Sequence, residues 1–139
     1  MGKGDVFVIS APSGSGKTTI CRRLLDEVEK LELSISYTTR QLKQGEVDGR
    51  DYNFVDRAEF DKIIDRGGFL EFATVYGNYY GTARSTVQAI VENGSDALLE
   101  IDVQGGCNIK KAMPDAVLVG IFPPSWQALQ VCWPPTTPA

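Results

Sequence analysis

Hydrophobic residues along the chain form two alternating patterns, short continuous runs and longer stretches with helical spacing. The runs are too short for helices and are typical of strands buried on both faces of a parallel sheet. They cover residues 6–9, 96–101 and 117–122. A helix is predicted over 18–31, where an apolar stripe would pack on that sheet. The stripe consists of Ile20, Leu24, Val28 and Leu31. This alternation predicts an α/β fold.

The middle of the chain interrupts this pattern with aromatic and polar segments. Four further strands are predicted there, over 33–37, 51–55, 69–75 and 78–82. The last two would form an antiparallel pair around Tyr76 and Gly77. Residues 38–50 make a long polar loop, and long loops in compact domains usually have a function.

Helix signals follow the same order along the chain. Asp56, with Glu59 three residues later, is a capping box that predicts the start of a helix. Two more helices are expected over 83–92 and 103–111. The last segment, 131–139, holds three prolines, which exclude a regular helix or a central strand.

Composition narrows the function classes. A chain of 139 residues that is 42% apolar suits one compact domain, and a net charge of −4 opposes a broad nucleic-acid-binding surface. No apolar stretch reaches membrane-spanning length and residues 1–4 are unlike a signal peptide, so we expect a cytoplasmic protein without membrane partners. There is no histidine, but phosphoryl transfer depends on positioning and charge neutralisation and does not require it.

A glycine-containing loop between the first strand and the first helix has the features of a phosphate-binding loop. Gly14 and Gly16 let backbone N–H groups point at an anion, and the following helix adds its positive N-terminal end. Lys17 would reach the β- and γ-phosphates, and Thr18 would offer its hydroxyl to Mg²⁺. Ala11 stands where the strict motif has glycine. The predicted ATP phosphate site comprises Ala11, Pro12, Ser13, Gly14, Ser15, Gly16, Lys17, Thr18 and Thr19.

Two carboxylates lie at the end of the apolar run 96–101. Glu100 and Asp102 are two residues apart and therefore project to the same side of a strand. Taken alone, the pattern also fits acids that face solvent at a strand end. An apolar strand that ends in acid is the usual partner of a phosphate loop, however, so the two motifs together predict a Mg²⁺-linked nucleotide site.

Four segments between these motifs resemble guanylate kinase, the family of enzymes that transfer the γ-phosphoryl group of ATP to GMP. They are residues 34–40, 45–54, 69–71 and 77–82, and the match in order and spacing runs from residue 6 to about 129. The resemblance implies a P-loop three-layer parallel sheet with an inserted small mixed α/β GMP-binding region. The core would comprise 1–34 and 95–130, the insertion about 35–94, and the non-matching tail 131–139.

The resemblance also assigns roles to individual residues. Catalytic positions are Lys17, Arg40 and Asp102, and positions near Mg²⁺, held mostly through water, are Thr18, Glu100 and Asp102. GMP-binding positions are Ser36, Arg40, Lys43, Tyr52, Glu71, Tyr80, Thr82 and Asp102. Lys43 stands where the family has an arginine, and a lysine cannot form the two parallel hydrogen bonds by which a guanidinium binds phosphate. Guanine has N–H donors that suit the Glu71 carboxylate and an O6 acceptor that suits a hydroxyl.

The resemblance stops after about Leu129, where complete guanylate kinases continue with a lid, a last strand and a C-terminal helix. We therefore expect a truncated or frameshifted chain of reduced activity, because arginines such as those of the lid contribute roughly 10³-fold or more to phosphoryl transfer. Two functions stay open. One is an ATP:GMP phosphotransferase with Mg²⁺, ATP and GMP as partners, acting as a monomer or homodimer. The other is a non-catalytic guanylate-kinase-like nucleotide-binding or protein-interaction module.

Overall fold

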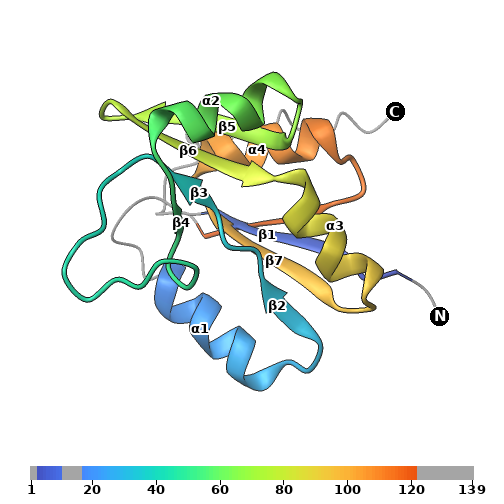
Figure 1. Ribbon diagram of the computed structural model, residues 1–139. Coiled ribbons are helices and arrows are strands. Elements are labelled where there is room, and N and C mark those ends of the chain that lie inside the picture. The colour runs from blue at the N-terminus through green and yellow to red at the C-terminus, as the bar shows by residue number, and fades with distance from the viewer. Residues whose placement is uncertain (1–2, 11–16, 122–139) are drawn as a thin grey trace.

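The computed structural model describes residues 3–10 and 17–121, and a four-stranded parallel sheet lies at its centre (Figure 1). The strands, in spatial order, are β2 (Leu31–Leu33), β7 (Asp96–Ile101), β1 (Val6–Ser10) and β8 (Val117–Gly120). All neighbouring strands in this sheet are parallel. The three continuous apolar runs of the sequence are therefore confirmed as strands β1, β7 and β8 of one parallel sheet. The expected burial of β8 on both faces is wrong for its described part, because Val117 and Val119 are 45% and 41% exposed, and residue 122 of that run lies outside the described residues.

Helices cover both faces of this sheet because consecutive side chains of a strand point to opposite sides. Val6 and Val8 of β1 pack in a core with α3 (Arg84–Glu92) and α4 (Val103–Ala112). Ile9 belongs to the opposite core, which contains Cys21 of α1 (Lys17–Glu27). The three layers can be followed in Figure 1 and confirm the predicted α/β fold class.

The first helix is shorter than predicted. α1 ends at Glu27, and Leu31, expected in the helix, instead begins β2. Lys30 has a left-handed backbone with φ of 59°, which turns the chain between the two elements. Leu31 still packs against the core around Cys21, as its apolar character predicts, but it reaches that core from a strand and not from a helix.

A second sheet is built mainly from the middle of the chain. Its order is β4 (Asn53–Phe54), β3 (Tyr37–Thr38), β6 (Asn78–Ala83) and β5 (Phe69–Val75). β5 and β6 form the predicted antiparallel pair. The strand predicted over 33–37 is wrong in extent, because residues 34–36 pass from the first sheet to the second. The strand predicted over 51–55 is shorter than expected, since β4 comprises only two residues, which pair with β3.

The helix α2 (Arg57–Asp65) packs on the second sheet through an aromatic core. The predicted cap is confirmed, since the Asp56 Oδ1 atom accepts the Glu59 N–H at 2.8 Å. Phe60 is fully buried, and its ring centroid lies 4.5 Å from that of Phe69 and 5.4 Å from that of Tyr79. This aromatic core is separate from the two cores of the first sheet.

The two sheets meet along one side of β5, which packs beside α4 of the first sheet. Residues 37–83 form the second sheet and α2, whereas α3 packs on the first sheet. Among the helices in the described part of the chain, none combines the length and apolar character needed to span a membrane.

Candidate nucleotide-binding site

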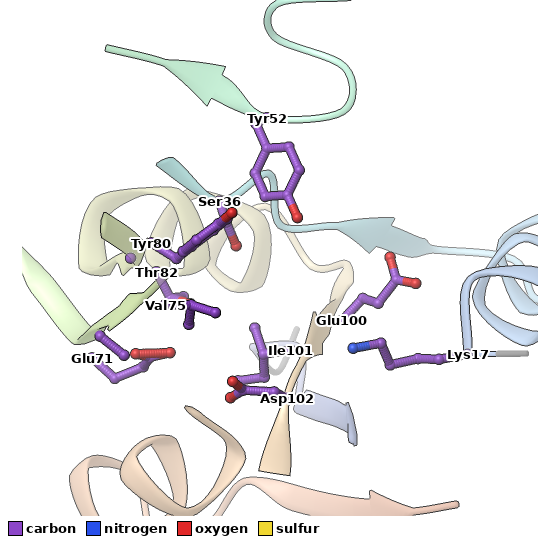
Figure 2. Close-up of a pocket in the computed structure, with 12 residues that line it drawn as sticks. Lys17, Ser36, Tyr52, Glu71, Val75, Tyr80, Thr82, Glu100, Ile101 and Asp102 are labelled. Atoms are coloured by element: carbon purple, nitrogen blue, oxygen red, sulfur yellow. The ribbon is translucent and has the colours of Figure 1, made fainter. Parts of the chain in front are cut away.

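A cavity of about 220 Å³ opens between the two sheets, at the carboxyl end of β7 (Figure 2). Its walls come from β5 and β6 of the second sheet and from β7 and α1 of the first. We call it the first cavity. It is lined by Lys17, Ser36, Tyr52, Glu71, Ala73, Val75, Tyr80, Gly81, Thr82, Glu100, Ile101 and Asp102.

A second cavity of about 280 Å³ lies beside the first. The two share Ser36, Tyr52 and Glu100, so they are adjoining compartments of one site. The second cavity is lined by Thr18, Leu33, Ser34, Ile35, Ser36, Arg40, Glu46, Asp51, Tyr52 and Glu100.

Most residues singled out in the sequence lie around these cavities. Those on the first are Lys17, Ser36, Tyr52, Glu71, Tyr80, Thr82, Glu100 and Asp102, and those on the second include Thr18 and Arg40. Lys43 and Thr19 are exposed and line neither cavity. Residues 11–16 of the predicted phosphate loop lie outside the described residues.

Glu71 of β5 reaches the first cavity from the second sheet, and Asp102 faces it from the end of β7 (Figure 2). Burial, followed by the negative charge of Asp102, raises the pKa of Glu71 to about 7. Its buried Oε2 atom accepts no hydrogen bond from the described residues. The Glu71 carboxylate also packs closely against the backbone of Gly105, because a Cβ atom there would lie 2.6 Å from Glu71 Oε1.

Hydroxyl groups also lie buried around the site with unused capacity for hydrogen bonds. Thr82 is 1% exposed, and within the described ranges its Oγ1 atom has no hydrogen-bond partner. The same holds for the Oγ atom of Ser34 in the second cavity. Buried polar groups of this kind cost free energy unless a ligand or water pairs with them. Together with Glu71 they suit a ligand that offers both donors and acceptors.

Asp102 has a structural role beside its place in the cavity. Its Oδ1 atom accepts the Gly105 N–H at 2.7 Å and caps the N-terminus of α4. Its backbone carbonyl accepts the Ser10 hydroxyl at 3.2 Å. The sequence motif at the strand end therefore fixes the start of the next helix as well as supplying a carboxylate to the site.

The donors proposed to lie near Mg²⁺ are spread over both cavities. Thr18 lines the second cavity, Asp102 the first, and Glu100 both. The described residues contain no group of three or more histidine, cysteine or carboxylate side chains that could hold a metal directly. The Glu100 Oε1 atom is nevertheless buried and unpaired among them, which fits a carboxylate that holds a hydrated ion through water.

Arg40 is fixed in the wall of the second cavity by charge and by aromatic rings. Its Nη1 and Nη2 groups donate hydrogen bonds to Glu46 Oε1 and Oε2, both at 2.9 Å. Its guanidinium carbon lies 5.2 Å from the ring centroid of Tyr52. Hydrogen bonds from Arg40 and from the Lys43 backbone lower the pKa of Glu46 to about 2, and the bond to Glu46 raises the pKa of Arg40.

Sequence reasoning about function did not single out Glu46 or Ser34. The long polar loop 38–50 was a signal for Glu46, since a loop of that length was expected to have a function. No local pattern marks Ser34, because its place in the cavity wall follows from the crossing of the chain between the two sheets.

A parallel sheet covered by helices on both faces, with a ligand cavity at the carboxyl ends of its strands, defines an α/β nucleotide-binding protein. The family model for guanylate kinase matches residues 3–133. The chain therefore belongs to the guanylate kinase family.

Individual relatives agree with this assignment. The chain is 51% identical over 130 residues to a guanylate kinase of Methylococcus capsulatus, an alignment that covers 94% of this chain and 64% of the relative. It is 49% identical over 127 residues to that of Chromobacterium violaceum, covering 91% and 60%. The guanylate kinase structure from Anaplasma phagocytophilum superposes with a TM-score of 0.74 at 36% identity, covering 94% and 66%. The chain thus spans about 60% of the length of curated relatives.

Proposed function

We propose that the protein transfers the γ-phosphoryl group of ATP to GMP, giving ADP and GDP. The observation that supports this most strongly is the buried Oε2 atom of Glu71 beside the Thr82 hydroxyl in the first cavity, since neither has a hydrogen-bond partner in the part of the chain that the structure describes. The guanylate kinase relatives support the same reaction.

Guanine would bind in the first cavity. Its N1–H and N2–H groups would donate to the Glu71 carboxylate, and its O6 atom would accept from hydroxyls such as those of Thr82 and Ser36. Adenine has no donor at N1 and would leave the Glu71 carboxylate unpaired. Sites that lose a buried hydrogen bond in this way reject the wrong ligand strongly.

The 5′-phosphate of GMP would bind where the two cavities join. Arg40, Tyr52 and Tyr80 supply one positive charge and two hydroxyls there. Lys43 is exposed and lines neither cavity, so its proposed contact with the phosphate requires its long side chain to turn toward the site. We infer that Arg40 is the principal phosphate ligand.

Lys17 points into the first cavity between Glu100 and Asp102 (Figure 2), where it can neutralise charge on the transferring phosphoryl group. Mg²⁺ bound with ATP would supply further charge neutralisation at the phosphate oxygens. Thr18, Glu100 and Asp102 would hold that ion mostly through water. Asp102 keeps one carboxylate oxygen for this task while the other caps α4.

Three further properties belong to the same proposal. The core would comprise residues 1–34 and 95–130, with the GMP-binding insertion at about 35–94. The protein would act in the cytoplasm, where ATP and GMP are available, as a monomer or homodimer. The non-catalytic alternative has no support from the relatives, which are named as guanylate kinases.

The test combines binding and turnover on the purified chain. Calorimetry should show binding of GMP but not of AMP, and Glu71→Gln should weaken GMP binding. A coupled assay with ATP, GMP and Mg²⁺ should show turnover that Lys17→Ala abolishes. Equal binding of AMP and GMP would contradict the assignment of the first cavity, and GMP binding without any turnover would favour the non-catalytic alternative.

A further inference from the structure

Glu46 lines the second cavity but has no role in the reaction proposed above. Its two carboxylate oxygens accept hydrogen bonds from the two terminal nitrogens of Arg40, each at 2.9 Å. The Oε1 atom also accepts the backbone N–H of Lys43 at 2.8 Å. One carboxylate therefore ties the Arg40 side chain to the backbone of the polar loop that follows it.

Among the hydrogen bonds of the described residues, those of Arg40 to Glu46 and Gln41 leave two neighbouring N–H groups of its guanidinium. A guanidinium has five N–H donors. Bonds to the two Glu46 oxygens, and one from Nη1 to the Gln41 carbonyl at 3.0 Å, use three of them. The other two, on Nε and Nη2, lie side by side and match two oxygens of one phosphate group. The hydroxyls of Tyr52 and Tyr80 also interact with this guanidinium, so a phosphate bound there would meet them as well.

The same guanidinium also makes cation–π contacts with two aromatic rings. Its central carbon lies 5.2 Å from the ring centroid of Tyr52 and 5.7 Å from that of Phe54. The Arg40 side chain is only 14% exposed, compared with 75% for Arg23 in an ion pair on the surface of α1. Contacts within the protein thus restrict the Arg40 side chain, which reduces the conformational entropy lost on binding.

We propose that Glu46 is a positioning residue that holds Arg40 with its remaining pair of N–H groups toward the 5′-phosphate of a nucleoside monophosphate. The inference rests on the proposed function, in which Arg40 binds that phosphate. Glu46 itself carries a negative charge and would repel the phosphate directly. Its net effect is favourable because it fixes the orientation of the arginine that binds the ligand.

Binding of GMP and of guanosine to the 139-residue chain separates this role from a general structural one. In Glu46→Gln the affinity for GMP should fall about 10-fold, the lower end of the effect of residues that orient ligand-binding side chains at metal sites. Guanosine lacks the phosphate, so its affinity should not change. Glu27→Gln is the matched control, since it removes the exposed ion pair between Arg23 and Glu27, and it should alter neither affinity.

A double-mutant cycle tests whether Glu46 acts through Arg40. In an Arg40→Met background, Glu46→Gln should cause no further loss of GMP affinity. The positioning role is overturned if Glu46→Gln binds GMP as well as or better than the unaltered protein, or loses GMP and guanosine affinity equally. Failure of the unaltered protein to bind GMP would overturn the proposed function itself, and this inference with it.

Discussion

Glu71 lies buried with a second carboxylate, Asp102, nearby. Both conditions favour its neutral form, and they raise its pKa from 4.5 to about 7. Guanine recognition needs the charged form, because the N1–H and N2–H groups both require an acceptor. In the proposed function, ligand binding would therefore be coupled to loss of the Glu71 proton near neutral pH.

We predict that guanosine affinity rises as the pH increases from about 5.5 to about 8 and then becomes constant. Below the pKa of Glu71 the ligand must displace a proton, whereas above it the carboxylate is already charged. Calorimetry across this range measures the effect, and guanosine avoids the titration of the GMP phosphate. Glu71→Gln should give weak binding without this slope; the same slope in that variant would assign the titration to another group.

At the scale of elements, the first turn of α4 determines where the Glu71 carboxylate lies. Asp102 caps this helix, and Gly105 leaves room for Glu71 beside it. A Cβ atom at position 105 would lie 2.6 Å from Glu71 Oε1 and 3.1 Å from Asp102 Oδ1. The end of the Glu71 side chain is flexible and can move away from an added Cβ atom. The substitution would therefore displace the carboxylate from the ligand site and leave the helix in place.

We predict that Gly105→Ala lowers GMP affinity by about 10-fold or more while the free energy of unfolding stays the same or rises, because alanine favours a helix over glycine by about 1 kcal/mol. Gly106→Ala is the neighbouring control. Its Cβ atom would meet the Ser10 Oγ atom and the Leu118 side chain, so it should mainly reduce stability. Calorimetry and urea unfolding measure the two effects. Unchanged GMP affinity in Gly105→Ala would show that Glu71 has more room than the packing indicates.

The helix α2 and the second sheet depend on their own aromatic core. We predict that Phe60→Ala, which removes a fully buried ring, lowers the free energy of unfolding by about 3–5 kcal/mol. Phe72→Ala is the control, since that ring contacts the same cluster but is 43% exposed and should cost much less. Urea unfolding followed by circular dichroism gives both values, and similar losses in the two variants would contradict a core centred on Phe60.

For the molecule as a whole, the sequence predicted best what depends on local pattern. The runs that became β1 and β7, the β5–β6 pair and the Asp56 cap were all predictable, because each depends on neighbouring residues. The end of α1 was not, since Leu31 could satisfy its burial from a helix or a strand. Residues of the site were known from family resemblance, but their placement opposite one another depends on how two sheets meet.

The hydrogen-bonded pair of Arg40 and Glu46 could not be predicted from the sequence either. Both residues belong to one polar loop without regular secondary structure, so neither the helical nor the strand period relates their side chains. Their pairing depends on the loop closing over Tyr52 and Phe54. Loop conformation of this kind cannot be derived from apolar periodicity, which carries most of the information about regular elements.

Glu71 lies in β5 of the second sheet, whereas Asp102 directly follows β7 of the first, so their charges act across the contact between the two sheets. When both are charged, their repulsion acts between the two halves of the molecule and not only between two side chains. A ligand that donates N–H groups to Glu71, as proposed for guanine, would offset that repulsion, so the carboxylate proposed to recognise the base would also affect how firmly the two sheets stay in contact.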